Sequence, residues 1–316
     1  MQVQWGSASD AGGRRKMNED AAFARHPVFV VADGMGGHAR GEMASRTVVA
    51  AFGALADQEG PITPADVTDA VRAGAEQIRQ TMEEEARQGG LGPDLADAMA
   101  GTTVAGVVLT HSDGEPYWLV LNVGDSRVYR FSRDRLEQVS VDHSLVQELV
   151  DAGELAPAEA RTHPRRNVIT RAVGTGLDVE VDYWMLHVGA DDRLLVCTDG
   201  LFGELGEDEI ADVLRTRMHP TAAAEELIER AVADGGARDN ITAVVVDVDN
   251  EDAVGTTATG SGHGRAEVVP PESDAEVAAR PERTFATTAP SPDAPLSTPT
   301  PVPATPLAPT PTTAES

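Results

Sequence analysis

Apolar residues in the first 250 positions form both unbroken runs and helically spaced series, a pattern that predicts a mixed α/β domain. Residues 28–32 (Val-Phe-Val-Val-Ala) are a short continuous apolar run, which is typical of a buried strand. Apolar residues recur at helical spacing from Ala44 to Leu55 and predict a helix over about 40–57. The same spacing predicts a longer helix over about 64–87.

Shorter patterns predict the remaining elements. Strands are expected at 102–110, 117–123, 126–131, 135–139, 179–187, 193–197 and 241–248. Helices are expected near 144–152, 157–162, 207–217 and 221–234. Consecutive strands flanked by paired helices favour stacked sheets with helices outside, rather than a strict βαβ alternation.

The composition changes near residue 250 and divides the chain into two parts. Residues 1–250 have the patterning of a globular domain, whereas residues 251–316 hold 12 of the 20 prolines and Phe285 as their one aromatic residue. Such a segment buries too little apolar surface to offset its ordering entropy. We therefore expect 251–316 to be a disordered Pro/Thr/Ala-rich tail, with a solvated spacer favoured over a ligand for proline-binding modules.

The charge balance excludes several classes of function. With 52 acidic and 25 basic residues, the net charge of −27 argues against a nucleic-acid or anionic-membrane binder. Lys16, the only lysine, does not lie in a Gly-Lys-Ser/Thr phosphate-binding loop. Cys197 is the only cysteine, so no internal disulfide forms. The sequence has no apolar run long enough for a membrane span and no leader-like start, and we expect a cytoplasmic protein.

Aspartates adjoin four of the predicted strands. Asp33, Asp125 and Asp199 follow strands, and Asp239 precedes the last one. Each alone is most simply a turn residue. If the last strand runs antiparallel to its neighbour, however, Asp199 and Asp239 emerge at the same sheet edge.

Several carboxylates at one sheet edge repel one another unless cations lie between them. Mg²⁺ and Mn²⁺ prefer oxygen ligands, and a pair of such ions can clamp a phosphoryl oxygen. Glycine at position 34 would let its backbone carbonyl turn toward an ion. The adjacent Glu19 and Asp20 are further acidic candidates.

Six motifs occur in one order: Arg15 with Asn18-Glu19-Asp20, Asp33-Gly34-Met35-Gly36-Gly37-His38, Gly101-Thr102-Thr103, Gly124-Asp125-Ser126-Arg127, Thr198-Asp199-Gly200 and Arg238-Asp239-Asn240. In this order they resemble the metal-dependent PPM (type 2C) serine/threonine protein phosphatases, and most closely the bacterial branch. The resemblance spans about residues 6–248. It implies a four-layer α/β/β/α sandwich of two antiparallel sheets flanked by helix pairs. Residues 143–171 resemble the bacterial flap and the segment after it.

The resemblance implies two or three Mn²⁺ or Mg²⁺ ions per chain. Asp33 would bridge two ions, with the Gly34 carbonyl on the second. Asp199 and Asp239 would bind the first ion. Glu19 and Asp20 would hold metal-bound waters. Asp125 would help Asp199 hold a weaker third ion.

The implied activity is hydrolysis of phosphoserine and phosphothreonine in proteins by a metal-bridging hydroxide, in opposition to eukaryotic-like serine/threonine kinases. Arg15 would bind the substrate phosphate through its bidentate guanidinium. Eukaryotic relatives carry a histidine, a candidate general acid, at the position of Met35. Because methionine cannot donate a proton, His38 or a metal-bound water is the candidate general acid in this chain. Many members also carry an acid at the position of Gly203, with Glu204 next to it here. We expect a monomer.

Two other functions fit parts of the sequence. Residues 34–39 match the glycine pattern of a dinucleotide-binding loop, but Asp33 would face the pyrophosphate and no acid-terminated strand follows about 20 residues later. A catalytically weak relative acting as a regulator or scaffold would lack a metal ligand, whereas all four aspartates are present. Cys197 is expected to be a buried strand residue. It is not the nucleophile of a cysteine phosphatase, because Gly203 occupies the place of that loop's arginine. His143, His163 and Arg171 are expected to be structural.

Overall fold

The structure is a computed structural model, and it describes residues 2–36, 39–88, 100–112, 114–176, 179–189, 192–233 and 237–249. The predicted tail at 251–316 therefore lies outside the described residues. Within the described part, no helix has the length and apolar character to cross a membrane.

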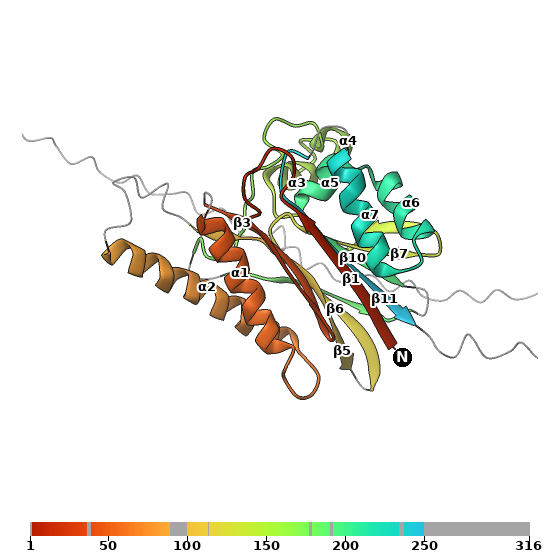
Figure 1. Cartoon of the computed structure of the whole chain (residues 1–316), viewed down its shortest axis with the longest axis horizontal. Coiled ribbons are helices and arrows are strands. Elements are labelled where there is room, and N and C mark those ends of the chain that lie inside the picture. The colour runs from red at the N-terminus through yellow and green to blue at the C-terminus, as the bar shows by residue number, and fades with distance from the viewer. Residues whose placement is uncertain are drawn as a thin grey trace, which may run out of the picture. The chain divides into compact units, whose positions relative to one another are not determined.

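The described strands form two antiparallel sheets (Figure 1). The five-stranded sheet has the order β1-β11-β10-β7-β8. Its strands are β1 (Gln2–Asp10), β11 (Ile241–Asp249), β10 (Arg193–Cys197), β7 (Arg127–Ser132) and β8 (Arg135–Gln138). The six-stranded sheet has the order β2-β3-β5-β6-β9, with β4 paired to β3. Its strands are β2 (Asp20–Arg25), β3 (Val28–Met35), β4 (Gly101–Thr102), β5 (Val104–Ser112), β6 (Glu115–Val123) and β9 (Asp182–His187).

Helices cover the outer face of each sheet. α1 (Ala39–Leu55) and α2 (Pro64–Arg87) pack on the six-stranded sheet, and α2 begins with a capping box between Thr63 and Asp66. α5 (Asp199–Glu204), α6 (Glu207–Thr216) and α7 (Pro220–Val232) pack on the five-stranded sheet. The predicted four-layer α/β/β/α sandwich is confirmed.

Three apolar layers hold the sandwich together. In β3, Val28 and Val30 face the layer under α1 and α2, whereas Phe29 and Val31 face the layer between the two sheets. Because successive side chains of a strand point to opposite faces, a strand buried on both faces is apolar throughout. This explains the unbroken run at 28–32. The third layer lies between the five-stranded sheet and α5, α6 and α7.

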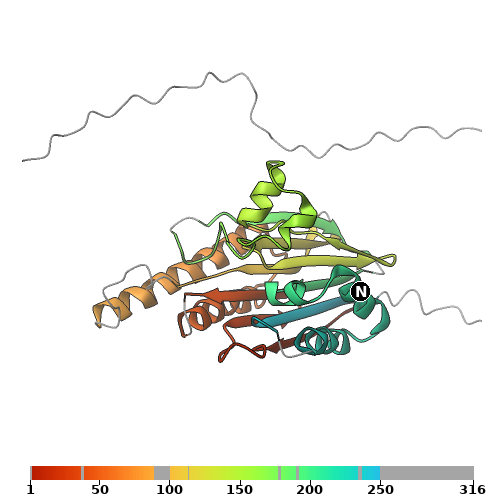
Figure 2. The ribbon, with the colours of Figure 1, turned by 90° about the horizontal axis from the view of Figure 1, so that it is seen from above.

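The remaining helices, α3 (Leu145–Asp151) and α4 (Pro157–Ala160), belong to residues 143–171, which we call the flap. Figure 2 shows these two helices projecting from one side of the sandwich. Ser144 caps α3 by accepting a hydrogen bond from the backbone N–H of Gln147 at 3.3 Å. A bridge between Ser144 and Ile169 joins the two ends of the flap, and the His143 backbone N–H donates to the Gly124 carbonyl of the sandwich at 2.8 Å.

The sequence patterns missed three elements: β1, β2 and α5. In β1, small and polar residues replace an apolar alternation. A side chain at Gly6 would lie 2.2 Å from the Cα of Thr221, so α7 approaches this strand too closely for larger residues. β2 has only six residues and begins at Asp20. α5 is a short helix that begins at Asp199, which we expected to end a strand.

Candidate active site

The aspartates predicted at strand ends meet around one cavity of about 330 Å³. Asp33 comes from the end of β3, Asp125 from the turn after β6, and Asp199 from the start of α5. Asp239 lies in the segment before β11. The antiparallel pairing of β10 with β11 brings Asp199 and Asp239 to the same sheet edge, as expected.

Other predicted residues lie on the same cavity wall. Arg15, Glu19 and Gly34 line it, whereas Asp20 lies behind it, paired with Asp33 in the register of β2 and β3. Arg15 forms an ion pair with Asp239, with 2.7 Å between Nη2 and Oδ2. The remaining prediction, His38, lies outside the described residues.

Burial and mutual repulsion raise the pKa values of the acidic side chains here. Burial, with added repulsion from Asp199 and Asp239, raises the pKa of Asp20 to about 7. Burial and the charge of Asp239 raise the pKa of Asp199 to about 6. Burial followed by neighbouring carboxylates also raises the pKa values of Asp33 and Asp125 well above their usual range.

Three buried carboxylate oxygens have no hydrogen-bond partner among the described residues. They are the Oδ1 atoms of Asp20, Asp125 and Asp199. A buried charged oxygen without a partner carries a large desolvation cost. The site therefore has a deficit of positive charge that bound cations would offset.

Hydrogen bonds from neighbouring residues hold the carboxylates in place. The Thr198 hydroxyl donates to Asp20 Oδ2 at 2.8 Å. The Thr103 hydroxyl accepts from the Asp33 backbone N–H at 3.0 Å, and the Thr102 hydroxyl donates to the Asp33 carbonyl at 2.8 Å. The Asn240 side-chain oxygen accepts from the backbone N–H of Glu19 at 2.8 Å.

Sequence reasoning gave no role to several residues of the site. Thr198 and Asn240 stood in the motifs, but their contacts join residues more than 170 positions apart. Asn167 and Ile169, at the end of the flap, line the cavity and carried no signal in the sequence.

Gly34 has a packing role. A side chain there would lie 2.1 Å from the carbonyl oxygen of Gly41 and 2.7 Å from that of Glu19. Only glycine lets β3 approach the start of α1 this closely.

Residues expected to be structural make structural contacts. His143 Nδ1 accepts from the Gly124 N–H at 3.0 Å, and its Nε2 lies 3.1 Å from Asp182. Arg171 also pairs with Asp182. Cys197 is fully buried in β10, and burial raises the pKa of its thiol.

The described residues fit hydrated hard cations better than a closed cage. No group of three or more His, Cys, Asp or Glu side chains in the described part of the chain is arranged to hold one ion by itself. Mg²⁺ commonly keeps several waters and takes only one or two carboxylates. The unpartnered oxygens and the repulsion among the aspartates match that mode of binding. Glu204, next to Gly203, is instead bound to Arg238 at 2.9 Å.

The model of the family described as protein phosphatase 2C matches residues 13–234 of this chain. The serine/threonine protein phosphatase PstP of Mycobacterium tuberculosis is 39% identical over 247 residues, covering 78% of this chain and 45% of that protein. The serine/threonine phosphatase stp of Listeria monocytogenes is 32% identical over 251 residues, covering 76% of this chain and 94% of that protein. The chain thus spans less than half the length of the mycobacterial relative.

The chain is also similar to solved structures of serine/threonine phosphatases. The crystal structure of the M. tuberculosis serine/threonine phosphatase PstP/Ppp has a TM-score of 0.70 and 35% identity, covering 79% of this chain and all (100%) of that one. The PstP catalytic domain in complex with two manganese ions has a TM-score of 0.67 and 34% identity, covering 78% of this chain and 99% of that one.

Proposed function

Because the chain belongs to the protein phosphatase 2C family, we propose that it hydrolyses phosphoserine and phosphothreonine in proteins with the help of Mn²⁺ or Mg²⁺. The observation that carries the proposal is the cavity lined by Asp33, Asp125, Asp199 and Asp239, where buried carboxylates lack counter-charges. When bound, two ions would lower the pKa of a nearby water, so that it could lose a proton and attack phosphorus as hydroxide at neutral pH, and would offset charge on the phosphoryl oxygens.

The aspartates have separate tasks in this proposal. Asp33 would help to hold both ions, the Gly34 carbonyl would contribute to the second, and Asp199 and Asp239 would hold the first. Glu19 and Asp20 accept hydrogen bonds from coordinated waters. Asp125 and Asp199 hold a weaker third ion. The support is that these residues, from the ends of strands in both sheets, line one cavity with Asp20 behind it, together with the manganese-bound relative.

Arg15 binds the substrate phosphate. Its side chain is half exposed at the cavity, and one of its five N–H donors already contacts Asp239. The remaining N–H groups form a planar fork that matches two phosphate oxygens. The contact with Asp239 also orients this fork beside the acidic wall.

The leaving serine or threonine oxygen must gain a proton. Met35 lines the cavity but has no proton to donate. In this proposal His38, or a water held at the ions, would supply that proton, and no covalent intermediate would form on the chain.

Phosphorylated serine and threonine proteins are the proposed substrates, and eukaryotic-like serine/threonine kinases and their substrates are the proposed partners, with the chain acting as a cytoplasmic monomer. The support is the naming of the bacterial relatives as serine/threonine phosphatases. A catalytically weak regulator is the alternative. Its expected sign, a missing acidic ligand, is not found among the four cavity aspartates.

Hydrolysis of p-nitrophenyl phosphate and of a phosphothreonine peptide tests this function. After treatment with a chelator, the full chain should be inactive, and Mn²⁺ or Mg²⁺ should restore turnover of both substrates. Equal turnover with and without added metal would overturn the metal-dependent mechanism. No turnover at any metal concentration would favour the regulator.

A further inference from the structure

A second cavity, which we call the flap groove, opens beside the catalytic cavity. It has a volume of about 560 Å³, and Asp125, Asn167 and Asp199 line both cavities. A phosphorylated residue in the catalytic cavity would therefore place its neighbours in the substrate chain at the flap groove. The inference below rests on the proposed phosphatase activity.

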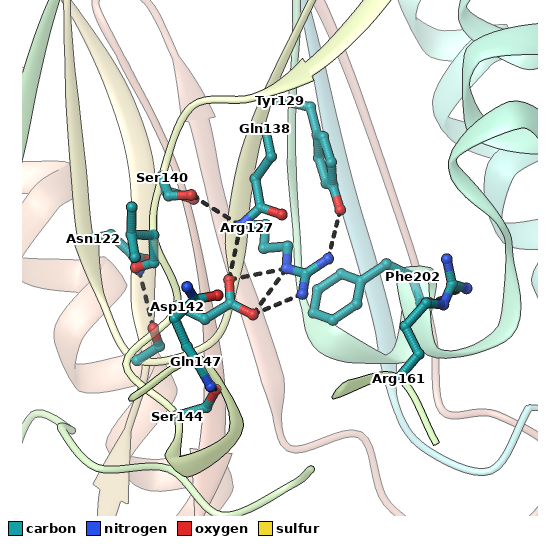
Figure 3. Close-up of polar contacts among 12 residues, drawn as sticks. Asn122, Arg127, Tyr129, Gln138, Ser140, Asp142, Ser144, Gln147, Arg161 and Phe202 are labelled. Carbon is teal, nitrogen blue, oxygen red and sulfur yellow. Dashed lines mark hydrogen bonds and ion pairs between the residues drawn. The ribbon is translucent and has the colours of Figure 1, made fainter. Parts of the chain in front are cut away.

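The floor of the flap groove is a set of polar groups that already satisfy one another. Arg127 donates to both carboxylate oxygens of Asp142, at 2.7–3.0 Å, and Gln138 donates to the same carboxylate at 3.0 Å. The Arg127 guanidinium also lies 3.8 Å from the ring centroid of Phe202 (Figure 3). The floor is thus held in place and contributes little free charge.

The flap supplies an apolar wall. Val146 and Val150 from α3, with Pro157 and Ala160 from α4, line the groove opposite Phe202 of α5. Apolar surfaces of this kind accept the stems of extended side chains, while polar ends remain at the rim.

The rim carries positive charge that the chain does not balance. Arg161 and Arg166 line the groove, and neither has a carboxylate within ion-pairing distance among the described residues. Arg161 makes only long contacts, at 3.5 Å, with the carbonyl oxygens of Phe202 and Leu205. Of the other charged residues that line the groove, Arg127 is paired with Asp142 and Arg238 with Glu204, and Glu207 adds one exposed carboxylate at the start of α6. Asp125 and Asp199 lie where the groove meets the catalytic cavity.

Arg14, Arg133, Arg135 and Arg165 also have no ion pair among the described residues, but of these unpaired arginines Arg161 and Arg166 are the two that line the groove. With a net charge of −27, carboxylates are abundant, and most arginines on the sandwich pair with one. Two unpaired arginines beside the catalytic cavity therefore fit an anionic group brought by another molecule.

We propose that the flap groove binds the substrate residues next to the phosphorylated residue, and that Arg161 and Arg166 select substrates with an aspartate or glutamate there. The apolar wall holds the stem of that acidic side chain, and the two guanidinium groups contact its carboxylate. Selection acts on substrate binding, because neither arginine lines the catalytic cavity.

The test compares phosphothreonine peptides that differ at one position. Glutamate is placed in turn at each of the four residues on either side of the phosphothreonine, and glutamine at the same position is the neutral control. In the Mn²⁺-loaded full chain, glutamate at one or two adjacent positions should raise kcat/KM about three- to tenfold over glutamine, mainly through KM.

Variants then locate the selection. In Arg161→Gln/Arg166→Gln the ratio of kcat/KM for the glutamate and glutamine peptides should fall to about one. Arg135→Gln is the matched control, because Arg135 is also exposed and unpaired among the described residues but lies on β8, away from both cavities. It should keep the wild-type ratio.

Three results would overturn the inference while leaving the phosphatase activity in place. They are a wild-type ratio near one at every position, a ratio that survives in the double variant, and a preference for a second phosphoserine with none for glutamate. No turnover of any peptide with Mn²⁺ would instead contradict the proposed function itself.

Discussion

Buried carboxylates occupy two different settings in this molecule. Asp142 and Asp192, beside the five-stranded sheet, are 7% and 3% exposed, and each is bound by an arginine at 2.7 Å. Asp20 and Asp125, at the catalytic cavity, are 7% and 6% exposed, yet each has an oxygen without a hydrogen-bond partner among the described residues. The two sets of carboxylates are therefore buried to a similar extent, but only the first set has its charge balanced by arginines.

The difference indicates where the fold depends on something other than its own side chains. The charge of a paired buried carboxylate is balanced by another side chain of the protein, and loss of that partner destabilises the fold. An unpaired cluster repels itself and raises its own pKa values, as Asp20 and Asp199 show. Bound cations would relieve that repulsion, so the two settings should respond differently to mutation, pH and metal.

The largest expected effect is the loss of activity when a metal ligand loses its charge. Asp33→Asn, Asp199→Asn and Asp239→Asn should each lower kcat for p-nitrophenyl phosphate by about 10³-fold or more, because charge stabilisation at the phosphoryl group is lost. Asp57→Asn, an exposed partner of Arg25, is the control and should retain normal turnover. Near-normal turnover by Asp239→Asn at saturating Mn²⁺ would contradict the assignment.

The paired setting should respond through stability. Arg127→Leu leaves Asp142 buried without its partner, so the free energy of unfolding should fall by about 3–5 kcal/mol. Arg25→Leu removes a pair whose side chains are 48% and 69% exposed, and should cost less than about 1 kcal/mol. Urea denaturation measures both. A similar loss of unfolding free energy in the two variants would show that burial does not determine how much these ion pairs contribute to stability.

Asp125 tests the weaker third ion. Asp125→Ala should lower turnover of a phosphothreonine peptide by roughly 10²-fold, the scale of losing a positioned proton-transfer element. Two tight ions should remain, because Asp33, Asp199 and Asp239 are intact. Glu137→Ala, an exposed carboxylate on β8, is the control. Unchanged turnover with a lowered Tm would mean that Asp125 only stabilises its turn.

The smallest expected effect is the pH dependence of the metal-free chain. Burial raises the pKa of Asp20 to about 7, so the folded chain holds this proton more tightly than the unfolded chain does. Stability from this group is present at about pH 4 and is lost as the pH rises toward about 7. The Tm of the metal-free chain should therefore fall by a few degrees between pH 5 and 8.

Asp20→Asn removes this titration and should raise the Tm of the metal-free chain at pH 8. His143 acts in the opposite sense, because burial lowers its pKa, and it is unchanged in this variant. Added Mn²⁺ should reduce the pH dependence of the wild type. A Tm that rises with pH in the metal-free wild type but not in Asp20→Asn would contradict the assigned shift.

Local patterns predicted the elements whose sides are both buried or cleanly amphipathic. The strand at 193–197 and the helix at 64–87 were predicted with the bounds that the structure gives. β1 was missed because its small residues reflect the close approach of α7 at Gly6, which is a tertiary contact. Periodicity does not record such contacts.

The same limit applies to the site. Asp33, Asp125, Asp199 and Asp239 could be predicted to converge because each adjoins a strand end. The flap groove could not, because its wall depends on how two short helices pack beside Phe202. The order of the motifs carried the family resemblance, and the resemblance supplied the fold; the family match and the solved structures confirmed the family and the fold.

We expect the unpaired aspartates of the catalytic cavity to bind cations. Calorimetric titration of the chelator-treated full chain with Mn²⁺ tests this expectation most directly. We expect two tight binding sites and one weaker site in the wild type, and loss of both tight sites in Asp33→Asn, because Asp33 is proposed to help hold both ions. Arg130→Leu, which unpairs the buried Asp192 and lines neither cavity, should retain them. Absence of saturable Mn²⁺ binding in the wild type, or two tight sites in Asp33→Asn, would contradict it.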